Sequence, residues 1–83
     1  MPVPDYAEIL ADVEDLIRRF IKNPVTIEED TELVNGLGLD SLLVMEVIQE
    51  VEDRFDIFFP LNTLAEIRTV KDFVLQIQRE IGG

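Results

Sequence analysis

Near the middle of the chain lies the stretch Gly36-Leu37-Gly38-Leu39-Asp40-Ser41-Leu42, around which the rest of the sequence is arranged. Two glycines loosen the backbone, and an Asp-Ser pair then precedes the clearest helical pattern in the chain. A helix start needs one N-cap acceptor, and Asp40 supplies it with a charge that suits the positive helix end. Ser41 then falls at the first helical position, where its hydroxyl is not needed for capping. Two interpretations follow: a serine with a purely structural role, or a serine to which a phosphate-linked group is attached.

After this corner, the spacing of apolar residues predicts a helix from about Ser41 to Phe55. The core face follows the i, i+3, i+4, i+7, i+11 rule and comprises Val44, Val47, Ile48, Val51 and Phe55. The opposite side carries apolar residues among acidic and polar ones, a combination that is typical of a partner surface. Roughly opposite the core face lie Leu42, Glu46, Gln49 and Asp53, flanked by Met45 and Glu52.

Before the corner, an apolar stripe predicts a first helix from about Asp5 to Lys22, with Asp5 as its cap. Asn23-Pro24 is expected to stop it, because the residue before proline avoids the helical region. Residues 1–4 are predicted to be a disordered lead-in. Residues 23–40 form a long connection whose scattered apolar residues predict that it packs against the core.

After the central helix, Pro60 suits the start of a short helix from about Leu61 to Ile67, in which Leu64 and Ile67 face inward. Phe58 and Phe59 leave two alternatives: opposite directions in an extended segment, or burial of both rings at a kinked turn. A last helix follows Thr69, with Asp72 in the capping-box position and Gly82-Gly83 at its end. The predicted fold is therefore all-α, a small four-helix bundle. It consists of three longer amphipathic helices, one short helix and a long first loop, in one domain that spans residues 1–83.

The composition of the 83 residues limits the catalytic groups, metal sites and partners that the chain can have. The chain has no Cys and no His, which excludes thiolate nucleophiles, disulfides and zinc sites and leaves carboxylates, hydroxyls, two lysines and Tyr6 for catalysis. The acidic run of residues 28–32 fails the EF-hand pattern, so no metal site is predicted. A net charge of −11 disfavours nucleic acid and anionic membranes as partners and favours a basic protein surface. No apolar run reaches the ~18 residues of a membrane span, and the start lacks a signal-peptide layout, so a cytoplasmic location is expected.

The segment Gly38-Leu39-Asp40-Ser41-Leu42 resembles the attachment motif of the acyl carrier protein family. The similarity extends to residues 33–42, Glu46, residues 50–56 with Pro60, and residues 67–70. The resemblance implies a free-standing, monomeric carrier and not an enzyme. It also implies that a phosphopantetheinyl transferase attaches 4′-phosphopantetheine from coenzyme A to Ser41, with Mg²⁺.

In that family the thiol of the attached arm holds an acyl group as a thioester, and basic patches of partner enzymes dock on the acidic second helix. Carried over by position, the docking residues would be Asp40, Leu42, Met45, Glu46, Gln49, Glu52 and Asp53. An acyl pocket between the helices would lie near Val47, Ile48, Leu64 and Ile67.

The chain departs from the pattern of fatty-acid carriers at three positions. Leu39 stands where those carriers more often have Ala, while Leu43 and Phe58 stand where they often place an acid. Leu39 makes the motif more similar to that of polyketide carriers, and the three departures together indicate a specialised pathway. The pathway itself stays open among fatty-acid, polyketide and related specialised lipid synthesis. Two alternatives stay open: an aminoacyl or peptidyl carrier within the family, and an unmodified acidic helical adaptor that binds a basic partner.

Overall fold

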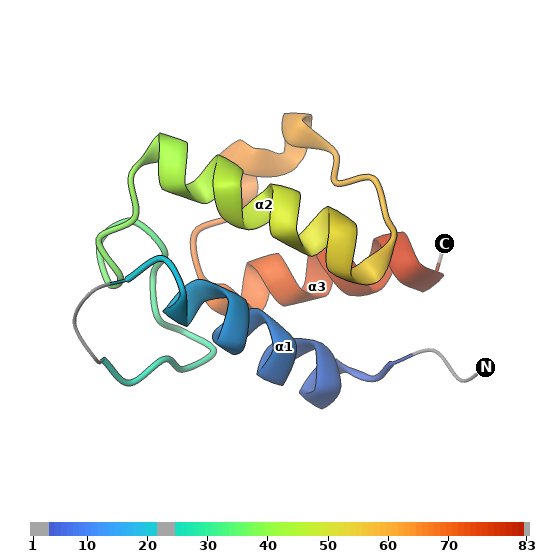
Figure 1. Ribbon diagram of the computed structural model, residues 1–83, viewed down its shortest axis with the longest axis horizontal. Coiled ribbons are helices and arrows are strands. Elements are labelled where there is room, and N and C mark those ends of the chain that lie inside the picture. The colour runs from blue at the N-terminus through green and yellow to red at the C-terminus, as the bar shows by residue number, and fades with distance from the viewer. Residues whose placement is uncertain (1–3, 22–24, 83) are drawn as a thin grey trace.

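The computed structural model describes residues 4–21 and 25–82 and contains four helical elements (Figure 1). They are α1 (Tyr6–Arg18), α2 (Ser41–Phe55), the 3-10 helix η1 (Leu61–Glu66) and α3 (Val70–Gly82). Within these residues the only β-type pairing is an isolated bridge between Glu32 and Thr69. The predicted all-α four-helix fold is confirmed. The lead-in prediction falls mostly on residues 1–3, which lie outside the described ranges.

Helix α1 begins as predicted, because the Asp5 carboxylate accepts a hydrogen bond from the Glu8 N–H at 2.9 Å. It ends earlier than predicted, at Arg18. The N–H groups of Arg19 and Phe20 bond to carbonyls three residues back, at 3.2 and 2.9 Å, so the last turn tightens instead of continuing. Lys22, the predicted helix end, lies with Asn23 and Pro24 outside the described residues.

Helix α2 has the predicted bounds at both ends. Asp40 caps its start by accepting the Leu43 N–H at 2.9 Å. Asp56 ends it in the left-handed conformation (φ 54°) and returns its N–H to the carbonyl of Glu52. The short helix η1 ends at Glu66, one residue before the prediction, and is of the 3-10 type.

The start of α3 is a reciprocal capping box, as predicted. Thr69 Oγ1 accepts the Asp72 N–H at 3.2 Å, and Asp72 Oδ2 accepts the N–H groups of Arg68 and Thr69 at 3.1 and 3.2 Å. The bond from the Arg68 N–H, together with those from Thr69, holds the pKa of Asp72 below its ordinary value of 3.8. The long loop is fastened here as well, because Leu33 N–H donates to the Arg68 carbonyl at 2.9 Å.

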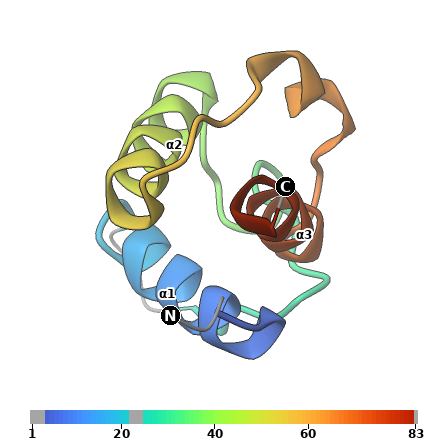
Figure 2. The same ribbon diagram turned by 90° about the vertical axis from the view of Figure 1, so that its right-hand side faces the viewer.

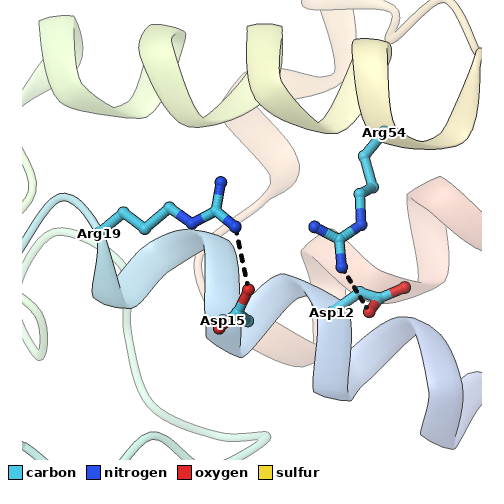
Figure 3. Close-up of polar contacts among 4 residues, drawn as sticks. All are labelled: Asp12, Asp15, Arg19 and Arg54. Atoms are coloured by element: carbon cyan, nitrogen blue, oxygen red, sulfur yellow. Dashed lines mark hydrogen bonds and ion pairs between the residues drawn. The ribbon is translucent and has the colours of Figure 1, made fainter.

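The three longer helices surround one apolar core, with α1 running against α2 and α3 and with η1 on the side away from α1 (Figure 1, Figure 2). Among the buried residues of the core are Ile9, Val13, Leu16, Ile17, Leu33, Leu39, Val47, Ile48, Val51, Phe59, Val70, Phe73, Val74 and Ile77. Arg54 on α2 reaches Asp12 on α1 at 3.1 Å, and Arg19, the residue that follows α1, pairs with Asp15 at 3.3 Å (Figure 3). Both pairs are well exposed and each is worth about 0–1 kcal/mol, so apolar packing holds the helices together.

No helix in the described ranges is long and apolar enough to cross a membrane.

Candidate functional site

The corner before α2 is built so that Ser41 is presented to solvent. Leu39 is buried and anchors the loop in the core, whereas Asp40 and Ser41 are exposed. Gly38 adopts φ 73°, a conformation that favours glycine, and the space around it is open. Gly36 has no room for a side chain, because a Cβ there would lie 2.6 Å from the Glu32 carbonyl oxygen. Each glycine is therefore required for a different reason.

The hydroxyl of Ser41 has no structural duty within the described residues. The cap is made by Asp40, whose carboxylate accepts the Leu43 N–H and whose carbonyl accepts the Val44 N–H at 2.9 Å. No described acceptor bonds the N–H groups of Ser41 and Leu42, which therefore point positive dipoles outward at the helix start. A free hydroxyl, two free N–H groups and open space fit the attachment of a phosphate-linked group at this position. Ser41 is also the only serine in the sequence.

A cavity of about 190 Å³ lies directly beside Ser41. It is lined by Leu33, Val34, Ser41, Val44, Met45, Ile48, Phe59, Leu64, Ile67 and Phe73. Three residues of the predicted acyl pocket, Ile48, Leu64 and Ile67, are brought together here. Val47 does not line the cavity and is 1% exposed within the core. The reason is helical rotation, because residues one apart in a helix differ in direction by about 100°.

Sequence reasoning missed most of the cavity wall, although a signal for part of it was present. Ser41, Val44, Met45 and Ile48 stand at i, i+3, i+4 and i+7, so they share one face of α2. Reading that stripe from Ser41 instead of from Val44 would have placed Met45 at the cavity. The contributions of Leu33, Phe59 and Phe73 depend on how the loop and α3 fold back, which periodicity within a helix does not record.

The buried end of the cavity is aromatic. Phe59 and Phe73 pack edge to face, with ring centroids 5.3 Å apart and planes at 89°. Phe59 is 1% exposed and its neighbour Phe58 is 78% exposed. The two rings therefore point in opposite directions, and the alternative of burying both at a kinked turn is wrong. The Glu52 carboxylate fixes this arrangement by accepting the Phe59 N–H at 2.9 Å.

The residues proposed for docking differ in their surroundings. Asp40, Leu42, Gln49 and Asp53 are exposed, whereas Met45, Glu46 and Glu52 are half-buried. Met45 also lines the cavity, and Glu52 holds Phe59.

Within residues 4–21 and 25–82, no ion pair neutralises the acidic charge on α2. Among the described residues the ion pairs use Asp12, Asp15 and Glu32, none of which belongs to α2. The one basic residue of α2, Arg54, is turned to α1. Apart from Glu52, whose carboxylate accepts the Phe59 N–H, the carboxylates of α2 therefore remain available to a basic partner.

Tyr6, one of the side chains left for catalysis by the composition, does not line the cavity. Burial and the neighbouring Glu29 carboxylate raise the pKa of Tyr6 to about 12. The phenol is therefore neutral at physiological pH and is a poor general base.

Comparison with known proteins bears on the same region of the chain. A family model described as "Phosphopantetheine attachment site" matches residues 9–77, which include Ser41 and every residue that lines the cavity. An acyl carrier protein of Wolinella succinogenes is 34% identical over 65 residues, which cover 78% of this chain and 86% of that protein. An acyl carrier protein of Exiguobacterium sibiricum is 33% identical over 75 residues, which cover 89% of this chain and 95% of that protein. A meromycolate extension acyl carrier protein of Mycobacterium tuberculosis is 34% identical over 80 residues, which cover 95% of this chain and 69% of that protein.

Proposed function

The chain belongs to the acyl carrier protein family and carries acyl groups on covalently bound 4′-phosphopantetheine, and we propose that Ser41 is the residue that bears this group. The observation that supports Ser41 is its spare hydroxyl at a helix start that Asp40 already caps. Its position at the rim of an apolar cavity adds to this support, since an acyl chain needs a place away from water.

We infer that a phosphopantetheinyl transferase performs the attachment with coenzyme A and Mg²⁺. The Ser41 oxygen forms a bond to phosphorus, the pyrophosphate bond of coenzyme A breaks, and adenosine bisphosphate leaves. Leu39 and Asp40 hold the serine in place during this step, one as a buried anchor and one as the helix cap. The attached group supplies a terminal thiol, which is the only one in the protein because the chain has no cysteine. We expect the protein to catalyse no reaction itself.

The docking surface proposed for the transferase and for acyl-processing enzymes is the acidic side of α2 together with its cap residue. It comprises Asp40, Leu42, Met45, Glu46, Gln49, Glu52 and Asp53. Leu42 is 68% exposed next to Ser41 and offers an apolar contact, while the unpaired carboxylates attract a basic patch over a distance. A partner would meet the apolar contact and the attachment site together.

For the pathway, we propose a specialised lipid synthesis. The support is the apolar character of Leu39, Leu43 and Phe58, together with the similarity to the meromycolate extension acyl carrier protein of Mycobacterium tuberculosis. The monomeric state and the cytoplasmic location stay predictions. The adaptor alternative is disfavoured, because the chain matches an attachment-site family over most of its length.

The attachment is tested by incubating the purified protein with coenzyme A, Mg²⁺ and a broad-specificity transferase, followed by measurement of the intact mass and peptide mapping. We expect a gain of one phosphopantetheinyl group, located on the peptide that contains Ser41. An unchanged mass would overturn the proposal, and so would a group mapped to one of the threonines.

A further inference from the structure

The segment that joins α2 to η1 exposes apolar side chains that the core does not use. Residues 57–61 read Ile-Phe-Phe-Pro-Leu, a run of apolar residues of which only Phe59 is buried. Phe58 is 78% exposed and Leu61 is 51% exposed. Such a run adds little to the core and favours aggregation, so its exposure points to a binding role. The segment lies at the end of α2 opposite the Ser41 corner (Figure 1).

The backbone on both sides of Phe58 is fixed by one residue of α2. The Glu52 carbonyl accepts the N–H groups of Asp56 and Ile57, the second at 3.2 Å. The Glu52 carboxylate accepts the Phe59 N–H at 2.9 Å. The ring of Phe58 is therefore presented to water by a segment that is already ordered, and a partner that binds it has little backbone left to order.

Glu52 also connects this segment to the proposed docking surface, of which it is a member. Its bond to the Phe59 N–H places the backbone of the segment beside the acidic side of α2. The 15 residues of α2, which begin at the Ser41 corner, span about 20 Å. A contact at each end of α2 fixes the direction of the helix on a partner, whereas a contact at the Ser41 end alone lets the protein pivot.

The charges around the segment select the kind of partner. Asp53 and Asp56 are exposed, and neither belongs to an ion pair of the described residues. Arg54, which lies between them in the sequence, is held by Asp12 on α1 at 3.1 Å. A two-fold dimer would bring the same carboxylates face to face, and the net charge of −11 repels an anionic membrane. An apolar pocket with Lys or Arg at its rim complements the segment instead.

We propose that Phe58 and Leu61 form a second docking contact, which inserts into an apolar pocket rimmed by Lys or Arg on an acyl-processing enzyme. The transferase needs only the Ser41 corner and α2, whereas enzymes that act on the loaded protein need the second contact as well. The inference rests on the proposed attachment at Ser41, because the second contact sets the direction in which the attached arm enters the enzyme.

The test begins by isolating a probe enzyme. The transferase loads Ser41 from a coenzyme A analogue whose thiol is replaced by a chloroacetamide, and the loaded protein is added to an extract of its native cells. An active-site cysteine thiolate of an acyl-processing enzyme attacks the chloromethyl carbon, chloride leaves, and a thioether joins the two proteins. The joined enzyme is identified by mass spectrometry and purified. The decisive measurement is the Kd of this purified enzyme for the phosphopantetheine-loaded protein and its variants.

Phe58→Ser is expected to raise this Kd at least about tenfold, as truncation of an aromatic anchor does. Phe58→Leu and Leu61→Ser should each raise it by less. Leu75→Ser is the matched control and should leave the Kd unchanged, since Leu75 is an exposed apolar residue of α3. Asp56→Asn removes one charge and keeps the left-handed residue, which asparagine tolerates, so it should weaken binding about two- to threefold at low salt only.

Loading by the transferase separates the outcomes. Phe58→Ser should gain the phosphopantetheinyl mass at the rate of the unaltered protein, which also shows that it is folded, and slower loading would overturn the division between transferase and enzyme. A protein that gains no mass overturns the attachment at Ser41.

A loaded protein that joins to no enzyme overturns the second contact alone, as does a Kd that is the same in Phe58→Ser and the unaltered protein. An equal loss in Leu75→Ser overturns it too. Sedimentation of the unaltered protein as a dimer that Phe58→Ser abolishes, or Phe58-dependent binding to vesicles of anionic phospholipid, would overturn it by placing a different occupant on the segment. Should Phe58→Ser fail to fold, Phe58→Leu and Leu61→Ser still decide.

Discussion

The starts of α2 and α3 carry the same kinds of residue and use them in opposite ways. At α3, the hydroxyl of Thr69 accepts the Asp72 N–H and the Asp72 carboxylate accepts two N–H groups in return. At α2, Asp40 provides the cap alone, and the hydroxyl of Ser41 bonds to no described residue. One helix start is closed by its own side chains, and the other leaves a hydroxyl and two N–H groups open to solvent.

The difference lies in position and not in residue type. Thr69 precedes its helix and sits at the N-cap, where an oxygen is needed, whereas Ser41 is one residue inside its helix, after the cap has been supplied. A hydroxyl at a helix start thus has a structural role when it serves as the N-cap. It is free for chemistry when a neighbouring residue serves as the N-cap instead. The predictions below set the two starts against each other.

Removal of Asp72 should be the more damaging of two capping changes. Asp72→Ala leaves two backbone N–H groups without an acceptor and removes a charge from the positive helix end, so we expect a loss of about 2 kcal/mol in the free energy of unfolding. Asp40→Ala removes one side-chain bond and should cost about 1 kcal/mol. Urea titration of both variants measures the difference. Equal losses would mean that the closed start of α3 contributes no more than the open start of α2.

The contribution of Asp72 should also depend on pH. Its pKa in the folded protein lies below the ordinary value of 3.8, so its stabilising effect is present above that value and is lost as the pH falls through the folded pKa. The stability gap between the unaltered protein and Asp72→Ala should therefore be constant at neutral pH and shrink below 3.8. Urea unfolding curves of both proteins, recorded at neutral pH and again at a pH below 3.8, measure this stability gap. A gap that is unchanged in acid would refute the charge-based account of how Asp72 stabilises the start of α3.

The open start should show its own electrostatic signature during loading. Glu46→Gln removes one carboxylate from the proposed docking side of α2 and should slow transfer by about two- to threefold at low salt, with a smaller effect at high salt. Glu8→Gln on α1 is the control and should leave the initial rate unchanged. If both variants slow the reaction equally, general acidity matters and not the docking side.

Much of this fold was predictable because the decisive signals are local. The Asp40 cap and the apolar repeat define α2 from within its own sequence, and Thr69 with Asp72 does the same for α3. The predicted end of α1 was wrong for a physical reason. The apolar stripe shows only that Phe20 and Ile21 pack against the core, and a tightened turn places them there as well as a helix does.

The proposed attachment at Ser41 follows from the capping argument and from the family motif, both of which can be read from the sequence. The shape of the cavity beside it cannot be read there. The orientation of Phe59 depends on a carboxylate seven residues earlier, and the depth of the cavity depends on Phe73 from another helix. Such long-range contacts exist only once the chain has folded.

The central claim is that Ser41 bears the phosphopantetheine, whereas the capping hydroxyl of Thr69 at the other helix start does not. The direct measurement is the intact mass of Ser41→Ala and Thr69→Ala after incubation with coenzyme A, Mg²⁺ and transferase, with the free energy of unfolding of each as a check on folding. Ser41→Ala should gain no mass and keep its stability within about 0.5 kcal/mol, because alanine is at ease in a helix. Thr69→Ala should load fully and lose about 1 kcal/mol of stability. A Ser41→Ala protein that still gains the phosphopantetheinyl mass would contradict the account.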